Sequence, residues 1–398
     1  MLSIAGYAAI APIPVIFDVP SRYFSVPLRA VIFLATAFVI VRRLLAWPTF
    51  RFTWFWLLFW SFWLLWSARV IVDGILNPSV LRLATAEYLM MGIGMCALPA
   101  LAVAIAGRKA ALNSALAWLW MLGAFALGAN IWLIARELDS GGLPALFVSR
   151  QFTETLNPIS LGALGASLVL SSIWSYVHQR PGSYLFKSMR AVALVMGSAA
   201  IIAGASRGPM VAVVIVAPLI FLSRVRLRRP GARIFRLALL AGLGGLLLIA
   251  GALFVDIESM ALFRRVDRGL FEDSARIHLY KEGWNLLARH PFLGAGVEPL
   301  GWYPHNLLLE SFLLNGVVSG VIFFLMFSYV VIKAVYAVLM GVSSAWIPLL
   351  FLQYAVGSLF SFAIYSSVPF WVLMTAVVAM CDSRGGSIAP ARSNCRTI

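Results

Sequence analysis

Charged residues are scarce in this sequence. Of its 398 residues only 12% are charged, whereas 62% belong to the hydrophobic set. Soluble domains average roughly 25% charged and about 45–50% apolar residues, so a soluble globular enzyme is excluded. The apolar residues form long continuous runs, and about 20 such residues suffice for one membrane-spanning helix. The composition therefore predicts an all-α, polytopic integral membrane protein.

Motifs for metal or redox chemistry are also missing. The three cysteines, Cys96, Cys381 and Cys395, are widely spaced and form no CxxC pair. The sequence has no aspartate-rich metal motif, no Walker loop and no HExxH. Residues 204–208 spell G-x-S-x-G, but that hydrolase motif needs a strand before the serine, and an apolar helix is predicted there. We therefore expect any chemistry to proceed without a metal or another cofactor.

The apolar runs predict twelve membrane-spanning helices. Residues 1–256 would hold the first nine, 257–304 a large outer loop, 305–381 the last three helices and 382–398 a tail. The predicted segments are 4–17, 27–41, 53–75, 86–106, 111–135, 158–177, 191–205, 209–223, 237–256, 314–338, 345–363 and 366–381.

The distribution of positive charge predicts the orientation. Placing the N-terminus in the cytoplasm puts more than half of the 31 basic residues on the inner side, including the run of arginines between 224 and 236. Of the 15 acidic residues, only Asp382 falls on that side. This satisfies the positive-inside rule, with both termini cytoplasmic and the large loop on the outer face. The net charge of +16 is thus explained by topology and anionic lipid, and no nucleic-acid partner is needed.

The outer loop concentrates ionisable residues. Three of the four histidines, His278, His290 and His305, lie in or at the edge of this loop. Residues 273–290 predict an amphipathic helix lying on the membrane, capped by Asp273 or Ser274 and ended by proline and glycine. Its apolar face would consist of residues at helical spacing: Ile277, Tyr280, Trp284 and Leu287.

Three residues in the second half of the sequence are candidates for chemistry. Arg276 sits in the first turn of the amphipathic helix, and Arg207 lies in a turn between the two short segments 191–205 and 209–223. His305 directly precedes the next helix. Two arginines suit a diphosphate leaving group, and a histidine suits removal of a proton from a hydroxyl. The alternatives are a salt-bridged surface arginine, an arginine reaching to water from a helix end, and a capping histidine. Glu310 is spaced too far round a helix for a His–Glu relay.

A tryptophan-rich segment precedes residue 67. Its members are Trp54, Trp56, Trp60, Trp63 and Trp66. We interpret it mainly as a lipid-facing helix with anchors at the membrane interface, rather than as a platform for stacking sugars.

Several short motifs occur in a fixed order between residues 195 and 340. They are Ser206-Arg207-Gly208, Asp273-Ser274-Ala275-Arg276 with Trp284, the stretch 290–296 (HPFLGAG), His305-Asn306 and Gly316. This ordered set, with a large outer loop between the ninth and tenth helices, resembles the O-antigen ligase and O-antigen polymerase superfamily. The resemblance implies a metal-independent glycosyltransferase of the GT-C type in the bacterial inner membrane. Such an enzyme takes a glycan from undecaprenyl diphosphate on the periplasmic face.

The resemblance also implies roles for individual residues. Arg207 and Arg276 would hold the diphosphate, and His305 would act as general base on the acceptor hydroxyl or orient it. Inversion at the anomeric carbon would follow from a single in-line displacement. The further residues expected to bind substrate are Arg265, Trp284, Tyr303 and Asn306.

Three enzymes and one non-enzyme are the alternatives, and the third enzyme is a related protein O-glycosylating transferase, which is less favoured than a ligase or a polymerase. A ligase passes the glycan to a lipid A–core sugar, whereas a polymerase passes it to a second undecaprenyl-linked glycan. Twelve spans with the major loop after the ninth favour the ligase, although the loop is short for one. A flippase or transporter of the lipid-linked glycan is disfavoured, because the charges cluster at helix ends and in one outer loop rather than at mid-membrane. The expected partners are the lipid-linked donor, the acceptor and membrane lipids.

Overall fold

The computed structural model describes residues 2–45, 53–76, 78, 81–106, 112–137, 156–179, 183–225, 275–301, 303–342 and 344–382. Within these ranges all regular structure is helical and no strand occurs, so the predicted all-α class is confirmed. The first half contains η1 (Leu2–Gly6), α1 (Tyr7–Ile10), α2 (Pro12–Phe17), α3 (Arg22–Leu45), α4 (Trp54–Leu76), α5 (Thr85–Leu89), η3 (Met90–Ala97), α6 (Leu98–Ala106) and α7 (Leu112–Glu137). The second half contains α9 (Pro158–His178), α10 (Tyr184–Gly204), α11 (Arg207–Val225), α14 (Ala275–Arg289), α15 (Leu307–Leu339), α16 (Trp346–Ser358) and α17 (Val368–Asp382).

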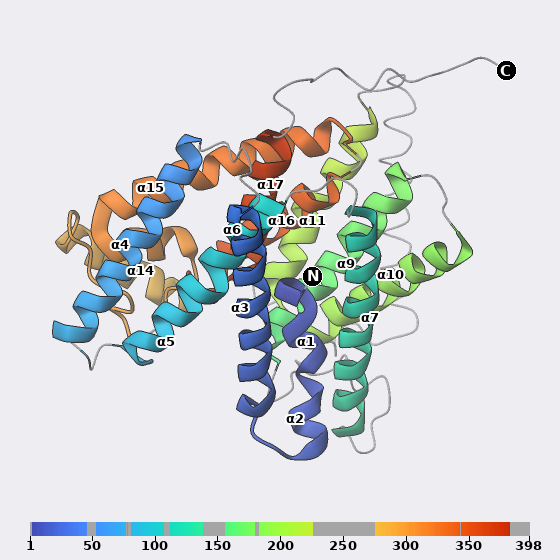
Figure 1. Cartoon of the computed structure of the whole chain (residues 1–398), viewed down its shortest axis with the longest axis horizontal. Coiled ribbons are helices and arrows are strands. Elements are labelled where there is room, and N and C mark those ends of the chain that lie inside the picture. The colour runs from blue at the N-terminus through green and yellow to red at the C-terminus, as the bar shows by residue number, and fades with distance from the viewer. Residues whose placement is uncertain are drawn as a thin grey trace.

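The helices group into two ends joined through a central pair. Figure 1 shows α4, α14 and α15 at one end and α7, α9 and α10 at the other. Helices α16 and α17 lie between them, and α16 contacts α9, α11, α15 and α17. The second half of the sequence therefore supplies the centre of the molecule, where elements from both ends meet.

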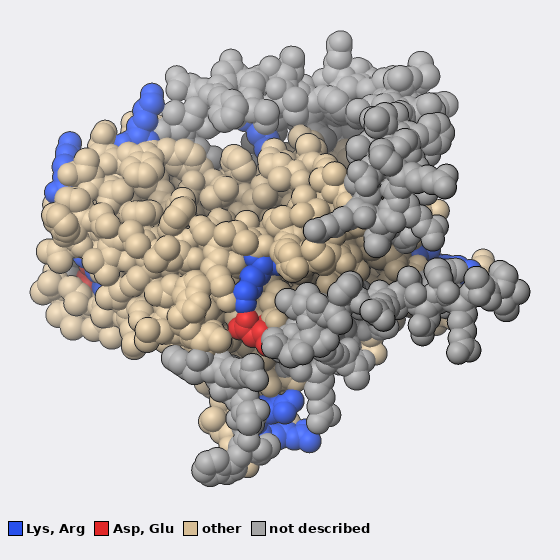
Figure 2. Space-filling model, turned by 90° about the horizontal axis from the view of Figure 1, so that it is seen from above, with Lys and Arg blue, Asp and Glu red and all other residues tan. Residues whose placement is uncertain are grey.

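Helix length and hydropathy show a multi-pass membrane protein. Among the described residues, seven helical stretches are long and apolar enough to cross a membrane: α3, α4, Thr85–Ala106, Ser114–Arg136, α9, α10 and α15. Four shorter apolar helices are Ser3–Phe17, Arg207–Ser223, Trp346–Ser358 and Val368–Asp382. These eleven stretches correspond to eleven predicted segments, and the remaining one, 237–256, lies outside the described residues. The count of twelve stays a prediction. On the face seen in Figure 2, most of the described surface carries no charged residue.

Helix α10 is longer than the apolar run that predicted it. The segment 191–205 was expected to be short, but the helix spans Tyr184–Gly204 and is long enough to cross a membrane. Lys187 and Arg190 lie in its first two turns, where long basic side chains can reach toward water from a helix end. The Arg190 guanidinium lies over the ring of Tyr176, 5.1 Å from its centroid. The prediction of a short helix was wrong because basic residues were taken to end it.

Helix α4 buries most of its tryptophans in the core, where lipid-facing tryptophans were predicted, and exposes other residues such as Leu57 and Leu64. Six of its aromatic side chains are at most 2% exposed: Phe55, Trp56, Phe59, Phe62, Trp63 and Trp66. Trp63 packs on Trp371 with ring centroids 4.8 Å apart, and Phe62 packs on Phe323 at 5.4 Å. Trp54, which is 49% exposed, fits the predicted surface position, and Trp60 is partly buried. Aromatic residues surround this helix on all sides, so their spacing does not reveal which face is buried.

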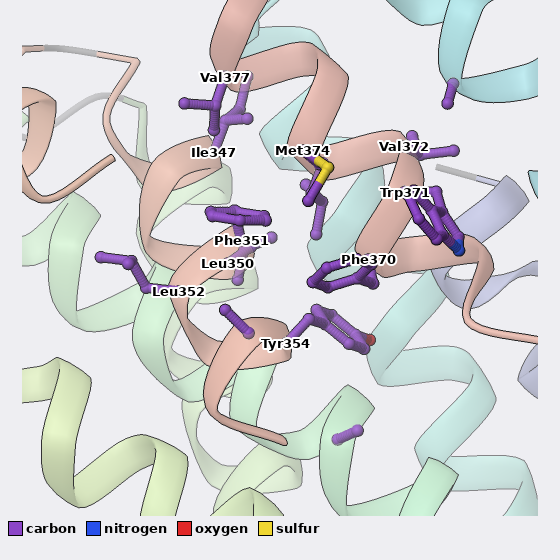
Figure 3. Packing of buried hydrophobic residues seen from close by; sticks show 14 of the residues in the cluster. Ile347, Leu350, Phe351, Leu352, Tyr354, Phe370, Trp371, Val372, Met374 and Val377 are labelled. Carbon is purple, nitrogen blue, oxygen red and sulfur yellow. The ribbon is translucent and has the colours of Figure 1, made fainter. Parts of the chain in front are cut away.

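The same aromatic core continues through α16 and α17. Figure 3 shows Phe351 of α16 beside Phe370 of α17, and their ring centroids are 5.8 Å apart. The Phe370 and Trp371 rings meet edge to face at 5.2 Å. Such aromatic pairs add about 0.5–1.5 kcal/mol each beyond the area that they bury. The packing fixes α17 against both α16 and α4.

Buried polar side chains join helices that are distant in sequence. Gln353 of α16 donates to the Ala163 carbonyl of α9 at 2.7 Å, and its carbonyl oxygen accepts from Ser167 at 2.9 Å. At the other end, Asn130 of α7 donates to the Ala8 carbonyl of α1 at 2.9 Å. Polar groups away from water need partners, so each of these bonds specifies one relative placement of two helices.

Helices α9 and α10 cross at a pair of glycines. A Cβ atom at Gly165 would lie 2.6 Å from the Gly197 carbonyl oxygen, and a Cβ atom at Gly197 would lie 2.6 Å from that of Gly165. Small residues let helix backbones approach this closely in membranes. The crossing positions the end of α10, where the Arg207 turn begins.

We expect Gly165→Ala to destabilise the protein by about 1–3 kcal/mol, because the added methyl group meets a backbone carbonyl that cannot rotate away. Thermal unfolding of the purified protein in detergent would measure this. The matched control is Gly128→Ala in α7, whose Cβ would lie 3.6 Å from the flexible Met196 methyl group. Equal unfolding temperatures for the two variants would contradict the close crossing.

Candidate functional site

The turn that carries Arg207 is pressed against the beginning of α9. Helix α10 ends at Gly204. The next residue, Ala205, caps it with left-handed φ and ψ of 41° and 40°, and α11 begins at Arg207. A Cβ atom at Gly204 would lie 2.8 Å from the Pro158 carbonyl oxygen. Pro209 lies in the first turn of α11, as predicted, and packs near Gly162 of α9. The tight turn thus fixes the position at which Arg207 leaves the helix end.

Helix α14, whose second residue is Arg276, docks on α15. Its buried face contains Tyr280, Gly283 and Leu287, which pack against the first turns of α15 around Leu309. Tyr280, one helical turn after Arg276, donates a hydrogen bond to the Leu359 carbonyl at 3.2 Å. The helix therefore packs its apolar face on the protein, where the sequence predicted packing on the membrane.

Two predictions for this region need comment. Trp284 was expected on the apolar face, and it lies one helical turn from both Tyr280 and Leu287, but its side chain is 58% exposed. Its substrate-binding role stays a prediction. The predicted caps Asp273 and Ser274, and the predicted substrate contact Arg265, lie outside the described residues.

The stretch 290–301 after α14 is held against α4 by hydrogen bonds with two side chains of that helix. The Asp73 carboxylate accepts from the Val297 backbone N–H at 2.9 Å and pairs with Arg69 at 2.8 Å. Arg69 in turn donates to the Leu293 carbonyl at 2.9 Å. One buried acid and its arginine thereby hold the backbone of this stretch from the side of α4.

The same stretch is inserted into a break in α15. Asn315 and Gly316 have non-helical φ and ψ within that helix. The Ala295 N–H donates to the Leu313 carbonyl at 2.7 Å, and the Val317 N–H donates to the Pro291 carbonyl at 2.8 Å. Gly294 has φ of +67°, and a Cβ atom there would lie 2.5 Å from the Leu313 carbonyl oxygen. The glycines of the 290–296 motif and Gly316 thus serve close backbone docking.

His305 lies between this stretch and the start of α15. It has φ of 57°, a left-handed conformation that is uncommon for residues other than glycine. The Tyr303 ring meets the His305 ring edge to face, with centroids 4.5 Å apart. Asn306 caps α15 by accepting from the Leu309 N–H at 3.0 Å, and its amide donates to the Leu359 carbonyl at 3.2 Å. The position of His305 is therefore fixed from both sides.

Residues 359–365, which connect α16 to α17, are the common neighbour of all three predicted positions. The Leu359 carbonyl accepts from both Tyr280 and Asn306, which lie one turn from Arg276 and next to His305. A Cβ atom at Gly208, next to Arg207, would lie 3.8 Å from the Phe360 Cβ. We call residues 359–365 the hub segment. Sequence reasoning assigned it to the end of one span and a short connection, because it contains no charged residue.

Two buried acids support the hub segment. Both oxygens of Glu310 accept from the Ile364 N–H, at 3.1 and 3.2 Å. Glu298 accepts from Tyr88 at 2.7 Å and from Tyr365 at 3.3 Å. Burial raises the pKa of Tyr365 and the Glu298 charge adds to the rise, so this phenol stays protonated at neutral pH and donates to Glu298. Glu310 thus bonds to backbone, in agreement with spacing that does not support a His–Glu relay.

Backbone strain gathers in the same place. Within the described residues, the non-glycine residues with positive φ are Asp18, Ala205, His305 and Phe362. Three of these belong to the Arg207 turn, the His305 stretch and the hub segment. Such conformations cost of order 1–3 kcal/mol each and are maintained only where the surroundings enforce them. Their clustering marks this region as one where precise placement of side chains takes precedence over stability.

The arrangement suits an anion more than a cation. The described residues contain no group of three or more His, Cys, Asp or Glu that could hold a metal ion. The two buried carboxylates nearby are already engaged by phenol and backbone donors. The predicted roles of Arg207 and Arg276 toward a phosphate and of His305 toward a proton stay predictions.

Comparison with known proteins gives one match. Residues 192–325 match the family model described as O-antigen ligase. A comparison with curated proteins found no match. The matched range begins in α10 and ends within α15, so it includes Arg207, Arg276, His305 and the 290–296 motif. The resemblance that the motifs predicted is confirmed over this range, which covers about a third of the chain.

Proposed function

We propose that this protein is an O-antigen ligase that moves a glycan from undecaprenyl diphosphate to a lipid A–core hydroxyl at the periplasmic face of the inner membrane. One observation carries the proposal. The elements bearing Arg207, Arg276 and His305, three residues that lie inside the range matching the family, meet at the hub segment. Residues that are about 100 positions apart in the sequence are thereby supported by one short stretch of backbone.

The reaction is a single displacement at the anomeric carbon. His305 accepts the proton of the acceptor hydroxyl, whose oxygen attacks the anomeric carbon from the side opposite the diphosphate. The bond between that carbon and the phosphate oxygen breaks, and its electron pair stays with the diphosphate. Arg207 and Arg276 neutralise the charge that develops there, and guanidinium groups suit this because they donate two parallel hydrogen bonds to phosphate. The product has inverted configuration.

A polymerase would use the same chemistry with a different acceptor, a second undecaprenyl-linked glycan. The ligase is preferred on the predicted arrangement of spans, and the acceptor decides between the two. Purified protein reconstituted with the lipid-linked donor should add sugar to lipid A–core. Growth of the lipid-linked glycan in the absence of core would instead establish the polymerase.

We expect Arg207→Ala and Arg276→Ala to lower kcat by about 10²–10³-fold, because each removes a charged donor from the leaving group. His305→Ala should lower kcat by about 10²–10⁴-fold, as expected for loss of a general base. The reconstituted transfer assay measures all three. His278→Ala and Arg289→Ala are matched controls on α14, where both side chains are exposed, and should retain normal rates. Near-normal transfer by all three site variants would overturn the assignment.

The buried acid Glu310 yields a separate prediction. Glu310→Ala removes the acceptor for the Ile364 N–H, which costs about 1–3 kcal/mol of stability. It also releases the hub segment, so we expect transfer to fall by at least about tenfold at a temperature where the variant is still folded. Glu310→Gln keeps one oxygen that can accept this hydrogen bond, so its stability and transfer rate should lie between those of the wild-type protein and Glu310→Ala. A fully active Glu310→Ala protein would show that the hub segment does not position the site.

Transfer should continue in the presence of a chelator, because the proposed chemistry uses guanidinium groups and imidazole where other glycosyltransferases use a cation. The assay is run with EDTA at an excess over total divalent metal. Loss of activity that added Mg²⁺ or Mn²⁺ restores would contradict the metal-independent mechanism.

A further inference from the structure

A cavity of about 340 Å³ lies beside the candidate site. Several elements line it. They are η1, α1, α3, η3, the beginning of α9, and the end of the hub segment with the residues that follow it. Tyr303 lines this cavity, and its ring contacts the ring of His305 at 4.5 Å between centroids. The cavity is thus separated from the expected general base by a single side chain.

The cavity and the Arg207 turn are both next to the beginning of α9 and the hub segment. At the beginning of α9, Asn157 and Ser160 line the cavity, whereas Gly162 faces Ser206 and Pro209 of the Arg207 turn. In the hub segment, Ser361 and Phe362 line the cavity, whereas Phe360 lies beside Gly208. The cavity beside His305 and the turn that bears Arg207 therefore share these two elements as neighbours. If the Arg207 turn takes the donor diphosphate, the cavity is available to the acceptor.

One positively charged side chain lines the cavity. Arg29 of α3 is partly buried and contributes to the cavity wall. Among the described residues, no carboxylate forms an ion pair with Arg29 and no hydrogen bond engages its guanidinium. The N-terminus of α9 meets the same cavity through Asn157 and Ser160, and the positive end of a helix dipole also favours an anion. Charge in the cavity is therefore positive and not compensated within the described chain.

The rest of the lining suits a sugar ring. Hydroxyl groups of Tyr303, Tyr365, Ser361 and Ser366 can donate and accept hydrogen bonds. The rings of Tyr303, Tyr365 and Phe362 provide apolar faces. The volume is near the lower end of the about 300–1,000 Å³ typical of small-molecule sites, which limits the occupant to one or two rings.

We propose that this cavity binds an acidic sugar of the acceptor glycan, with Arg29 pairing with its carboxylate or phosphate group. The proposal rests on the proposed function for the statement that the occupant is the acceptor. It adds a substrate preference, because an acceptor without an acidic group leaves the Arg29 charge without its counter-ion.

Binding of simple probes tests the site without requiring transfer. Glucose, glucuronate and glucose 6-phosphate differ at one position and give neutral, carboxylate and phosphate forms of one ring. Their dissociation constants for the full chain in phosphatidylcholine nanodiscs are measured by ligand-observed NMR. We expect at least one acidic probe to bind about tenfold more tightly than glucose, as for a charged hydrogen bond.

Substitution of Arg29 identifies the group responsible. Arg29→Gln should abolish the preference for the acidic probe, and Arg29→Lys should retain part of it. The matched control is Arg22→Gln, because Arg22 lies two turns earlier on α3, is exposed and does not line the cavity. A normal unfolding temperature for Arg29→Gln shows that loss of binding is not loss of fold.

Each contrary result has a distinct meaning. Equal binding of glucose and both acidic probes to the wild-type protein would overturn the proposal. If Arg29→Gln instead weakens binding of farnesyl diphosphate, Arg29 belongs to the donor site and the acceptor assignment is wrong. If phosphatidylglycerol nanodiscs displace the acidic probe, the cavity takes a lipid headgroup and the sugar proposal is also wrong. Transfer without acid preference would preserve the proposed function alone, whereas acid-selective binding without transfer would preserve only the cavity as a sugar site.

Discussion

A buried non-helical backbone has to find hydrogen-bond partners that water cannot supply, and this constraint shapes the centre of the molecule. The hub segment, residues 359–365, interrupts two packed apolar helices, and its peptide groups are held by side chains from elsewhere in the chain. Leu359 offers its carbonyl to Tyr280 and Asn306, and Ile364 offers its N–H to Glu310. A buried acid in an apolar helix is expensive, so its persistence reflects what it holds in place.

The same logic explains the stretch after α14. It is irregular, packs against α4 and enters a break in α15, and backbone groups of the stretch bond to the Asp73 carboxylate and to backbone groups of α15. Glycines occur where a Cβ atom would collide with neighbouring carbonyl groups. The 290–296 motif, which lies in the range matched by the family model, therefore supports the backbone around the candidate site. The chemistry that we propose for the arginines and the histidine needs this support.

These two irregular stretches also fix the surroundings of His305. The Tyr303 ring contacts the His305 ring and lines the cavity that Arg29 borders. The beginning of α9 and the hub segment border this cavity and also lie next to the turn that bears Arg207. The left-handed conformations of Ala205, His305 and Phe362 therefore occur in segments that surround the candidate site.

The amino-acid sequence by itself determined the class of the protein, because long apolar runs and a shortage of charge leave a chain no alternative to membrane helices. The predicted segments correspond to the described helices, and the ordered motifs around Arg207, Arg276 and His305 led to the family. The tertiary structure decided which faces are buried: the tryptophans of α4 and the start of α10 were misjudged, since aromatic and long basic residues suit both core and interface. It also decided the importance of residues 359–365, Glu310 and Arg29. No local pattern distinguishes them, because their roles arise from groups that meet only when distant segments pack together.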